Sequence, residues 1–173
     1  FTTSDNKKYD LIIGNPPYKK IRKNAPEALV LNEVCHGAPN LYFLFATMGI
    51  YNLDDNAEMV YITPRSWTSG AYFELFRKHL FTHAILSRIH LFESRNKVFD
   101  KESVLQETII FKIKKTLKQP KSIPISTTES NKDFAYINLI NIPYNVIVSG
   151  PSYYVHLVRD ETEIKTLHLI NRQ

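Results

Sequence analysis

Hydrophobic and polar positions alternate in blocks that predict strands and helices in turn along most of this chain. Residues 9–14 form an apolar, β-branched run that ends at Gly14, which is typical of a short buried strand. Aromatic and leucine side chains at helical spacing predict a helix over 70–82 whose stripe faces the core. The other expected elements, in chain order, are a helix at 40–52, a turn at 54–56, strands at 58–63 and 84–92, a charged loop at 93–103 and a strand at 104–114.

The character of the chain changes after Lys121. A Ser/Thr-rich run at 126–132, preceded by prolines, is typical of a turn or linker. We therefore expect two parts, residues 1–121 and a β-rich connecting segment, 122–173. The elements expected in the second part are β-rich stretches at 134–142 and 145–148, a strand at 153–158 and a helix after the capping-box sequence 160–163.

Length, charge and cysteine content narrow the classes of protein to which this chain could belong. A chain of 173 residues can bury the core of one domain, and its formal charge of +5 is compatible with a polyanionic partner. The single cysteine excludes an internal disulfide, and no CxxC or HExxH pattern indicates a metal site. The longest apolar stretch, 41–51, is too short to span a bilayer, and no signal peptide is visible, so we expect a cytoplasmic protein without membrane contact.

The candidate chemistry lies at the end of the first expected strand, in Asn15-Pro16-Pro17-Tyr18. Open α/β sheets bind ligands at the carboxyl ends of their parallel strands. The two prolines remove two backbone donors, Asn15 adds a side-chain carbonyl acceptor and Tyr18 adds a flat aromatic face. Two acceptors beside an aromatic ring suit a planar substrate that carries an amino group.

The exocyclic nitrogen of adenine is such an amino group, and it is a poor nucleophile because its lone pair is delocalised into the ring. If the Asn15 side-chain oxygen and the Pro16 carbonyl each accept one N–H, the lone pair turns out of the ring plane. Orientation and electrostatic preorganisation then supply the catalysis without a strong base. Stacking on Tyr18 would hold the base, with roughly 1–3 kcal/mol of stabilisation.

Residues 10–18 resemble motif IV of the N6-adenine DNA methyltransferases, most closely the gamma, or TaqI-like, branch of restriction–modification enzymes. The likeness continues downstream in the family's order and covers roughly residues 9–115. The later stretches resemble motif V at 40–45, motif VI at 60–67 and motif VIII at 98–100 with 108–111.

This resemblance implies an α/β fold with a partial Rossmann-like class I methyltransferase sheet and flanking helices. Family sheets have the strand order 3-2-1-4-5-7-6, and this chain would supply strands 4-5-7-6. No GxG loop occurs here, so we expect the C-terminal half of a catalytic domain, with the first half and a target-recognition domain elsewhere in a longer chain. The open edge of residues 9–14 should pair with a second copy or be covered by residues 122–158.

The resemblance also implies roles for individual residues. S-adenosylmethionine is the implied cofactor, with Asn15 and Phe45 beside it, and double-stranded DNA with a flipped adenine is the implied substrate. Phe99 would pack on the base opposite Tyr18. Contacts to the DNA backbone would come from the basic run after the loop, Lys19, Lys20, Arg22 and Lys23.

Two other functions fit parts of the pattern. The N5-glutamine methyltransferases that act on release factors share an NPPY loop, because a glutamine amide is also a planar NH₂ group. The chain could also be a non-catalytic DNA-binding or assembly domain that retains the loop. The basic run and the motif around Phe99 favour a nucleobase, and the intact loop favours an enzyme.

Overall fold

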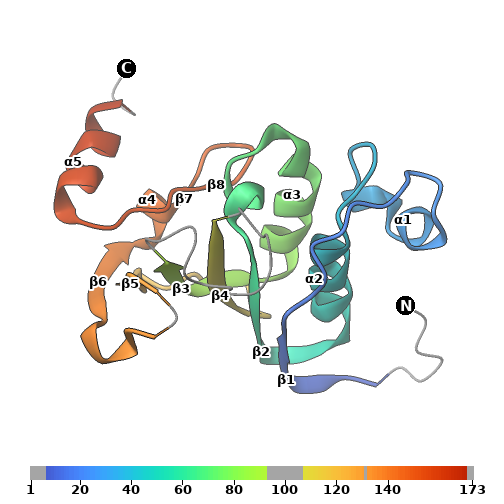
Figure 1. The fold of residues 1–173 in the computed structure, drawn as a ribbon, viewed down its shortest axis with the longest axis horizontal. Helices are drawn as coiled ribbons and strands as arrows, with labels where there is room; N and C mark the ends of the chain where they lie inside the picture. The colour runs from blue at the N-terminus through green and yellow to red at the C-terminus, as the bar shows by residue number, and fades with distance from the viewer. Residues whose placement is uncertain (1–6, 93–106, 131, 171–173) are drawn as a thin grey trace.

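The computed structural model describes residues 7–92, 107–130 and 132–170, which form an α/β structure around one mixed sheet (Figure 1). The six strands of this sheet lie in the order β1-β2-β4-β3-β5-β6. Their bounds are β1 (Tyr9–Gly14), β2 (Leu53–Pro64), β3 (Ile85–Phe92), β4 (Thr108–Lys114), β5 (Ser122–Thr128) and β6 (Asn138–Pro143). A separate hairpin pairs β7 (Val148–Ser149) with β8 (Tyr154–Val155).

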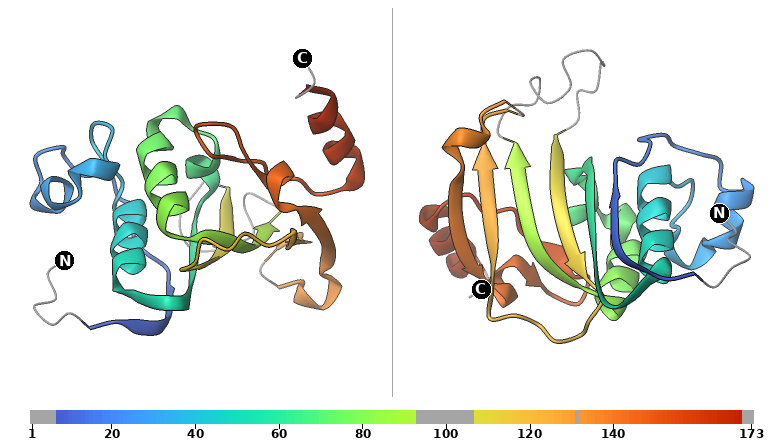
Figure 2. Two further views of the ribbon diagram at one scale, coloured as in Figure 1. Left: turned by 180° about the vertical axis from the view of Figure 1, so that it is seen from behind. Right: turned by 90° about the horizontal axis from the view of Figure 1, so that it is seen from below.

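The helices pack mainly against one face of this sheet. Their bounds are α1 (Pro26–Val30), α2 (Leu41–Asn52), α3 (Glu74–His83), α4 (Tyr144–Ile147) and α5 (Glu161–Ile170), with short 3-10 helices η1 (Asn32–Val34), η2 (Arg65–Thr68), η3 (Ala71–Phe73) and η4 (Phe134–Tyr136). Figure 2 shows α2, α3 and α4 on the same side of the sheet. Among the described helices, none has the length and apolar composition needed to cross a membrane.

The first four strands confirm the predicted sheet. β1 pairs with β2 in parallel, and β4 inserts between β2 and β3, antiparallel to both. This is the order 4-5-7-6 expected for a class I methyltransferase. Because β3 runs parallel to β2, and β5 runs parallel to β3, the carboxyl ends of four strands meet at one edge of the sheet. The loop that begins at Asn15 leaves β1 at that edge.

Helices α2 and α3 contribute several of the buried side chains above the sheet. The predicted stripe of α3 is confirmed, since Phe76 and Leu80 are buried. In α2 the buried side chains surround most of the helix, so it has no broad polar face. Gly49 permits this close packing, because a Cβ atom there would lie 2.4 Å from the sulfur of Met59.

The prediction of a linker at 126–132 is wrong for its first three residues, which form the end of strand β5. Ser126 and Thr128 are buried because both bind His90 of β3. The imidazole Nδ1 lies 2.9 Å from Ser126 Oγ, and Nε2 lies 3.1 Å from Thr128 Oγ1. Thr128 Oγ1 donates its proton to the Ser130 carbonyl, so it accepts from Nε2–H. The Ser126 hydroxyl lies within hydrogen-bonding distance of both Nδ1 and the Ile89 carbonyl. A buried histidine therefore satisfies hydroxyl groups that otherwise favour a loop.

Three other local expectations need correction. The stretch 145–148 lies almost entirely in helix α4, and the strand expected at 153–158 is only the two residues of β8. The turn expected at 54–56 falls within β2, at an irregularity where Tyr9 pairs with Leu53 and Leu11 with Glu58. Asn56 adopts φ 64° there, which accommodates the extra residues. The capping prediction is confirmed, because Asp160 Oδ1 accepts the N–H groups of Thr162 and Glu163.

Residues 122–158 do not cover the β1 edge, which corrects the second of the two expectations for that edge. β5 and β6 extend the sheet beyond β3, at the opposite end from β1. β5 pairs in parallel with β3, and its Ile123 and Ile125 join the buried core on that side.

Candidate active site

The loop with the candidate chemistry begins where β1 passes closest to β2. Gly14 pairs with Tyr61, and a Cβ atom at Gly14 would lie 2.8 Å from the Tyr61 ring. Any other residue would push the ring or the strand aside. Glycine at this position therefore lets the loop start directly against the second strand.

Asn15 and Pro16 face different surroundings. The Asn15 side chain is exposed and makes no hydrogen bond with the described residues, whereas Pro16 is buried and anchors the loop. The amide of Asn15 is therefore available as an acceptor at the carboxyl edge of the sheet. Pro17 is exposed and, like Pro16, has no N–H that could compete for that acceptor.

Tyr18 is half-buried and is held at two points. Its phenol donates a hydrogen bond to the Ile62 carbonyl at 3.2 Å, which fixes the tip of the ring to β2. The ring of Tyr42 packs against it in a T-shaped arrangement, with 6.2 Å between centroids and 85° between planes. Sequence reasoning missed Tyr42, because the residue lies among apolar neighbours on α2 and has no polar pattern of its own.

Backbone hydrogen bonds join this loop to the segment that resembles motif V. The Lys19 carbonyl accepts the N–H of Leu41 at 2.8 Å, and the N–H of Ile21 donates to Pro39 at the same distance. Lys20 and Asn40 form an antiparallel bridge between these two bonds. The start of α2 is thus positioned by the loop that follows Tyr18.

The motif VI loop packs behind this site. Trp67 is buried, and its indole N–H donates to Thr63 Oγ1 at 3.1 Å, so it belongs to the core. Arg77 of α3 is fully buried and donates from Nη1 to the carbonyls of Trp67, at 2.9 Å, and Gly70, at 2.7 Å. Its Nε donates to Ser152, which ties the loop to the segment before β8.

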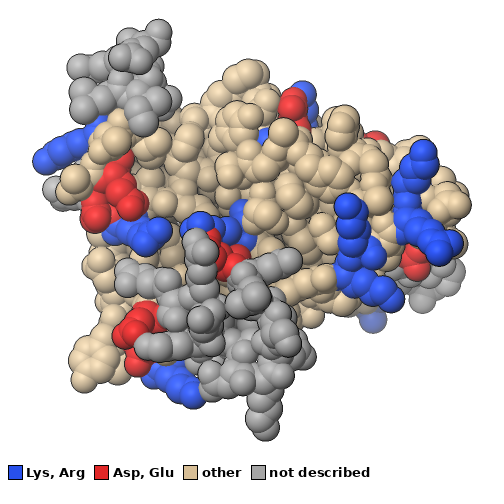
Figure 3. Space-filling model, turned by 45° about the horizontal axis from the view of Figure 1, so that its top comes forward, with Lys and Arg blue, Asp and Glu red and all other residues tan. Residues whose placement is uncertain are grey.

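The four residues predicted to contact the DNA backbone are all exposed and follow the Asn15–Tyr18 loop directly in the sequence. Figure 3 shows Lys and Arg side chains gathered on the side of the molecule that carries α1. The four residues predicted to contact the DNA backbone are Lys19, Lys20, Arg22 and Lys23. Their position beside the loop is compatible with phosphate contacts and equally with a solvated surface.

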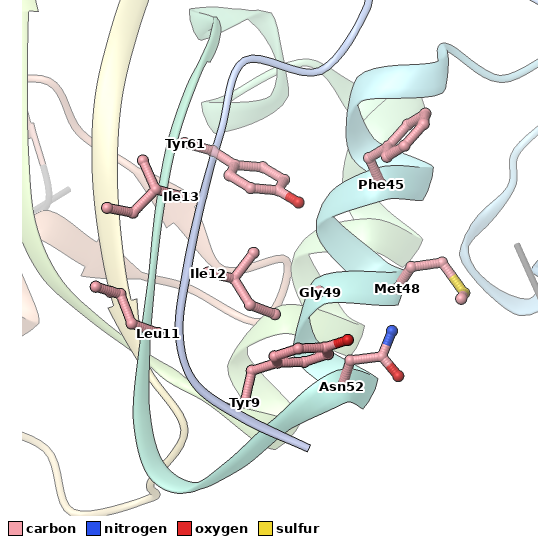
Figure 4. Close-up of a pocket in the computed structure, with 9 residues that line it drawn as sticks. All are labelled: Tyr9, Leu11, Ile12, Ile13, Phe45, Met48, Gly49, Asn52 and Tyr61. Carbon is pink, nitrogen blue, oxygen red and sulfur yellow. The ribbon is translucent and has the colours of Figure 1, made fainter. Parts of the chain in front are cut away.

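A hollow with a volume of about 470 Å³ lies between β1 and α2 (Figure 4). Phe45, predicted beside the cofactor, lines it with Met48 and Tyr61, whereas Asn15 does not. Figure 4 shows Ile12 pointing toward α2, and Leu11 and Ile13 pointing to the other side of the strand. Among the described residues, no acidic side chain lines the hollow, so the lining fits an apolar or aromatic part of a cofactor but supplies no carboxylate for ribose hydroxyls.

Two further predictions bear on the site. Phe99 lies outside the described residues, so its packing against a base stays a prediction. Among the described residues, no group of three or more histidine, cysteine or acidic side chains is placed to hold a metal ion.

Comparison with known proteins decides the family. The model of the Eco57I restriction-modification methylases matches residues 1–99, more than half of the chain. The chain belongs to this Eco57I family. This confirms the predicted relationship to the methyltransferases of restriction–modification systems.

Curated relatives of this Eco57I-family chain are longer proteins. The type II methyltransferase M.PstI of Providencia stuartii is 37% identical over 160 residues, which cover 90% of this chain and 31% of the relative. M.BsuBI of Bacillus subtilis is 38% identical over 145 residues, which cover 83% of this chain and 28% of the relative. The chain therefore spans about a third of the length of these relatives.

A solved structure supports the same fold. It is described as a class I S-adenosylmethionine-dependent methyltransferase from Listeria monocytogenes, and it superposes with a TM-score of 0.58 at 16% identity. The superposition covers 75% of this chain and 39% of the other. The Eco57I-family chain thus has part of a class I methyltransferase fold, as its strand order indicates.

Proposed function

We propose that the complete protein transfers a methyl group from S-adenosylmethionine to the N6 amino group of an adenine flipped out of DNA, within a restriction–modification system. The observation that carries this proposal is the loop Asn15–Tyr18. It leaves β1 at the carboxyl edge of the sheet, with the Asn15 amide exposed and the Tyr18 ring fixed beside it. Membership of the Eco57I family supports DNA, and not a protein glutamine, as the acceptor.

The residues of the loop have separate tasks in this proposal. Asn15 Oδ1 and the Pro16 carbonyl accept the two N–H groups of the amino nitrogen, so that its lone pair points out of the base plane. Tyr18 stacks on the base, and Phe99 is proposed to pack on the opposite face. S-adenosylmethionine, when bound, supplies an electrophilic methyl group, and Phe45, which lines the hollow between β1 and α2, would contact an apolar part of it.

The remaining parts of the proposal concern the DNA and the rest of the chain. Lys19, Lys20, Arg22 and Lys23 would contact phosphates without reading sequence. Residues 1–121 would form the C-terminal half of the catalytic domain. Residues 122–173, whose strands β5 and β6 continue the same sheet, would lead towards a target-recognition domain.

Replacing Asn15 with Ala in the complete protein tests this function. Loss of one preorganised acceptor should lower the single-turnover methylation rate roughly 10²- to 10³-fold. DNA affinity should stay close to the wild-type value, because phosphate contacts remain. Methylation by Asn15→Ala at the wild-type rate would contradict the proposal.

A further inference from the structure

Tyr42 touches both loops that border the candidate site. Only 2% of its surface is exposed, and its ring packs perpendicular to that of Tyr18 in the first loop. Its phenol oxygen lies 3.2 Å from Ser66 Oγ of the second loop, in η2. On its other side the ring packs against Phe73, with 6.1 Å between centroids. One buried side chain thus bridges the loops after β1 and β2.

The backbone around Tyr42 is fixed by the same two loops. The preceding residue, Leu41, donates its N–H to Lys19, the residue after Tyr18. Tyr18 in turn is bound at its phenol to Ile62 of β2. The Tyr18 ring is therefore held at its hydroxyl by β2 and on its ring by Tyr42, and small rotations of the Tyr18 plane are opposed from two directions.

We propose that Tyr42 is a positioning residue, which orients the aromatic plane of Tyr18 for stacking on the target base. This inference rests on the function proposed above and adds to it a residue that need not touch the substrate. Burial raises the pKa of the Tyr42 phenol far above its ordinary value, so the group stays neutral and serves as a hydrogen-bonding partner of Ser66.

The test compares variants of the complete protein in single-turnover methylation, DNA affinity and the fluorescence of 2-aminopurine at the target position. Tyr42→Met replaces the aromatic ring with a somewhat smaller, flexible apolar side chain and should lower the methylation rate about three- to ten-fold. The 2-aminopurine signal should change with it, and DNA affinity should stay within about two-fold. Tyr42→Phe keeps the ring and should restore both the rate and the signal.

Phe43→Met is the matched control, because Phe43 is the adjacent buried ring of α2 and packs on Phe73 and Phe76. It should lower thermal stability as Tyr42→Met does, and leave the methylation rate near wild type. Equal rate losses in the two variants would show a general core effect and would overturn the inference. So would an unchanged rate in Tyr42→Met.

A double-mutant cycle settles whether Tyr42 acts through Tyr18, even if Tyr42→Met is strongly destabilised. Adding Tyr42→Met to Tyr18→Ala should cause no further rate loss at a temperature where both proteins are folded. Fully additive losses would overturn the inference. If Asn15→Ala also methylates at the wild-type rate, the proposed function fails. If Asn15→Ala is defective and only the Tyr42 effects are missing, the failure is confined to Tyr42.

Discussion

The phenol of Tyr18 donates to the Ile62 carbonyl across 3.2 Å, which couples the loop after β1 to the neighbouring strand. Tyr18→Phe removes this bond and keeps the ring, so the cost to loop order should be about 1 kcal/mol or less. Tyr18→Ala removes the ring and should weaken retention of the flipped base by roughly 1–3 kcal/mol. Fluorescence of 2-aminopurine at the target position measures both variants in the complete protein. Equal signals from Tyr18→Ala and wild type would exclude a stacking role.

Cofactor affinity of residues 1–173 alone should be very weak. Phe45 and its apolar neighbours can contact an aromatic ring, but no carboxylate of the described residues lines the hollow between β1 and α2. Titration calorimetry with S-adenosylmethionine should therefore show no saturable binding in the micromolar range. A micromolar dissociation constant that Phe45→Ala weakens would place the main binding determinants within these residues, against this prediction.

The free edge of β1 should cause residues 1–173 to associate. Of the described strands, only β2 pairs with β1, and 73% of Ile13 is exposed. Because an unpaired apolar edge favours pairing with another chain, Ile13→Lys should shift the mass measured by light scattering towards the monomer. Leu139→Lys is the matched control, since Leu139 is an exposed residue on the opposite edge strand, β6. A wild-type chain that stays monomeric at high concentration would refute the edge argument.

Acidification should destabilise the described fold. Burial, together with the neighbouring His83, lowers the pKa of His79 to about 4, and burial and Arg88 lower the pKa of His90. The unfolded chain then binds protons first, near pH 6.5, so the free energy of unfolding should fall as the pH drops below that value. Urea titrations at pH 7.5 and pH 5 measure this loss. His90→Gln should reduce the difference between the two pH values, and an unchanged difference would exclude His90 as a source.

Much of the fold could be predicted because local pattern and tertiary position agree. The stripe of α3 and the order of the first strands follow from residues that pack where their periodicity indicates. Strand β1 forms where its apolar run predicts, but it was expected to be buried and is instead largely exposed, because it lies at the edge of the sheet. The Ser/Thr-rich end of β5 could not be predicted, because its hydroxyl groups are satisfied by His90, which lies 36 residues earlier than Ser126. Helix α4 was missed because Val146 and Ile147 favour strands, whereas burial in the core decides their conformation.

The candidate site was likewise predictable only in part. The loop Asn15–Tyr18 could be recognised from the sequence, because two prolines, an amide and a tyrosine directly follow a predicted strand. Tyr42 gave no such signal, because α2 is apolar around most of its surface and a tyrosine there looks like any other core residue. Its contacts with Tyr18 and Ser66 come from chain segments that only the fold brings together.

The central claim is that this site methylates the amino group of adenine in DNA. The most direct measurement is nucleoside mass spectrometry of DNA incubated with the complete protein and isotopically labelled S-adenosylmethionine. We predict label in N6-methyladenine, and roughly 10²- to 10³-fold slower labelling with Asn15→Ala. Label in a methylated cytosine, or in a protein glutamine and not in DNA, would contradict the account.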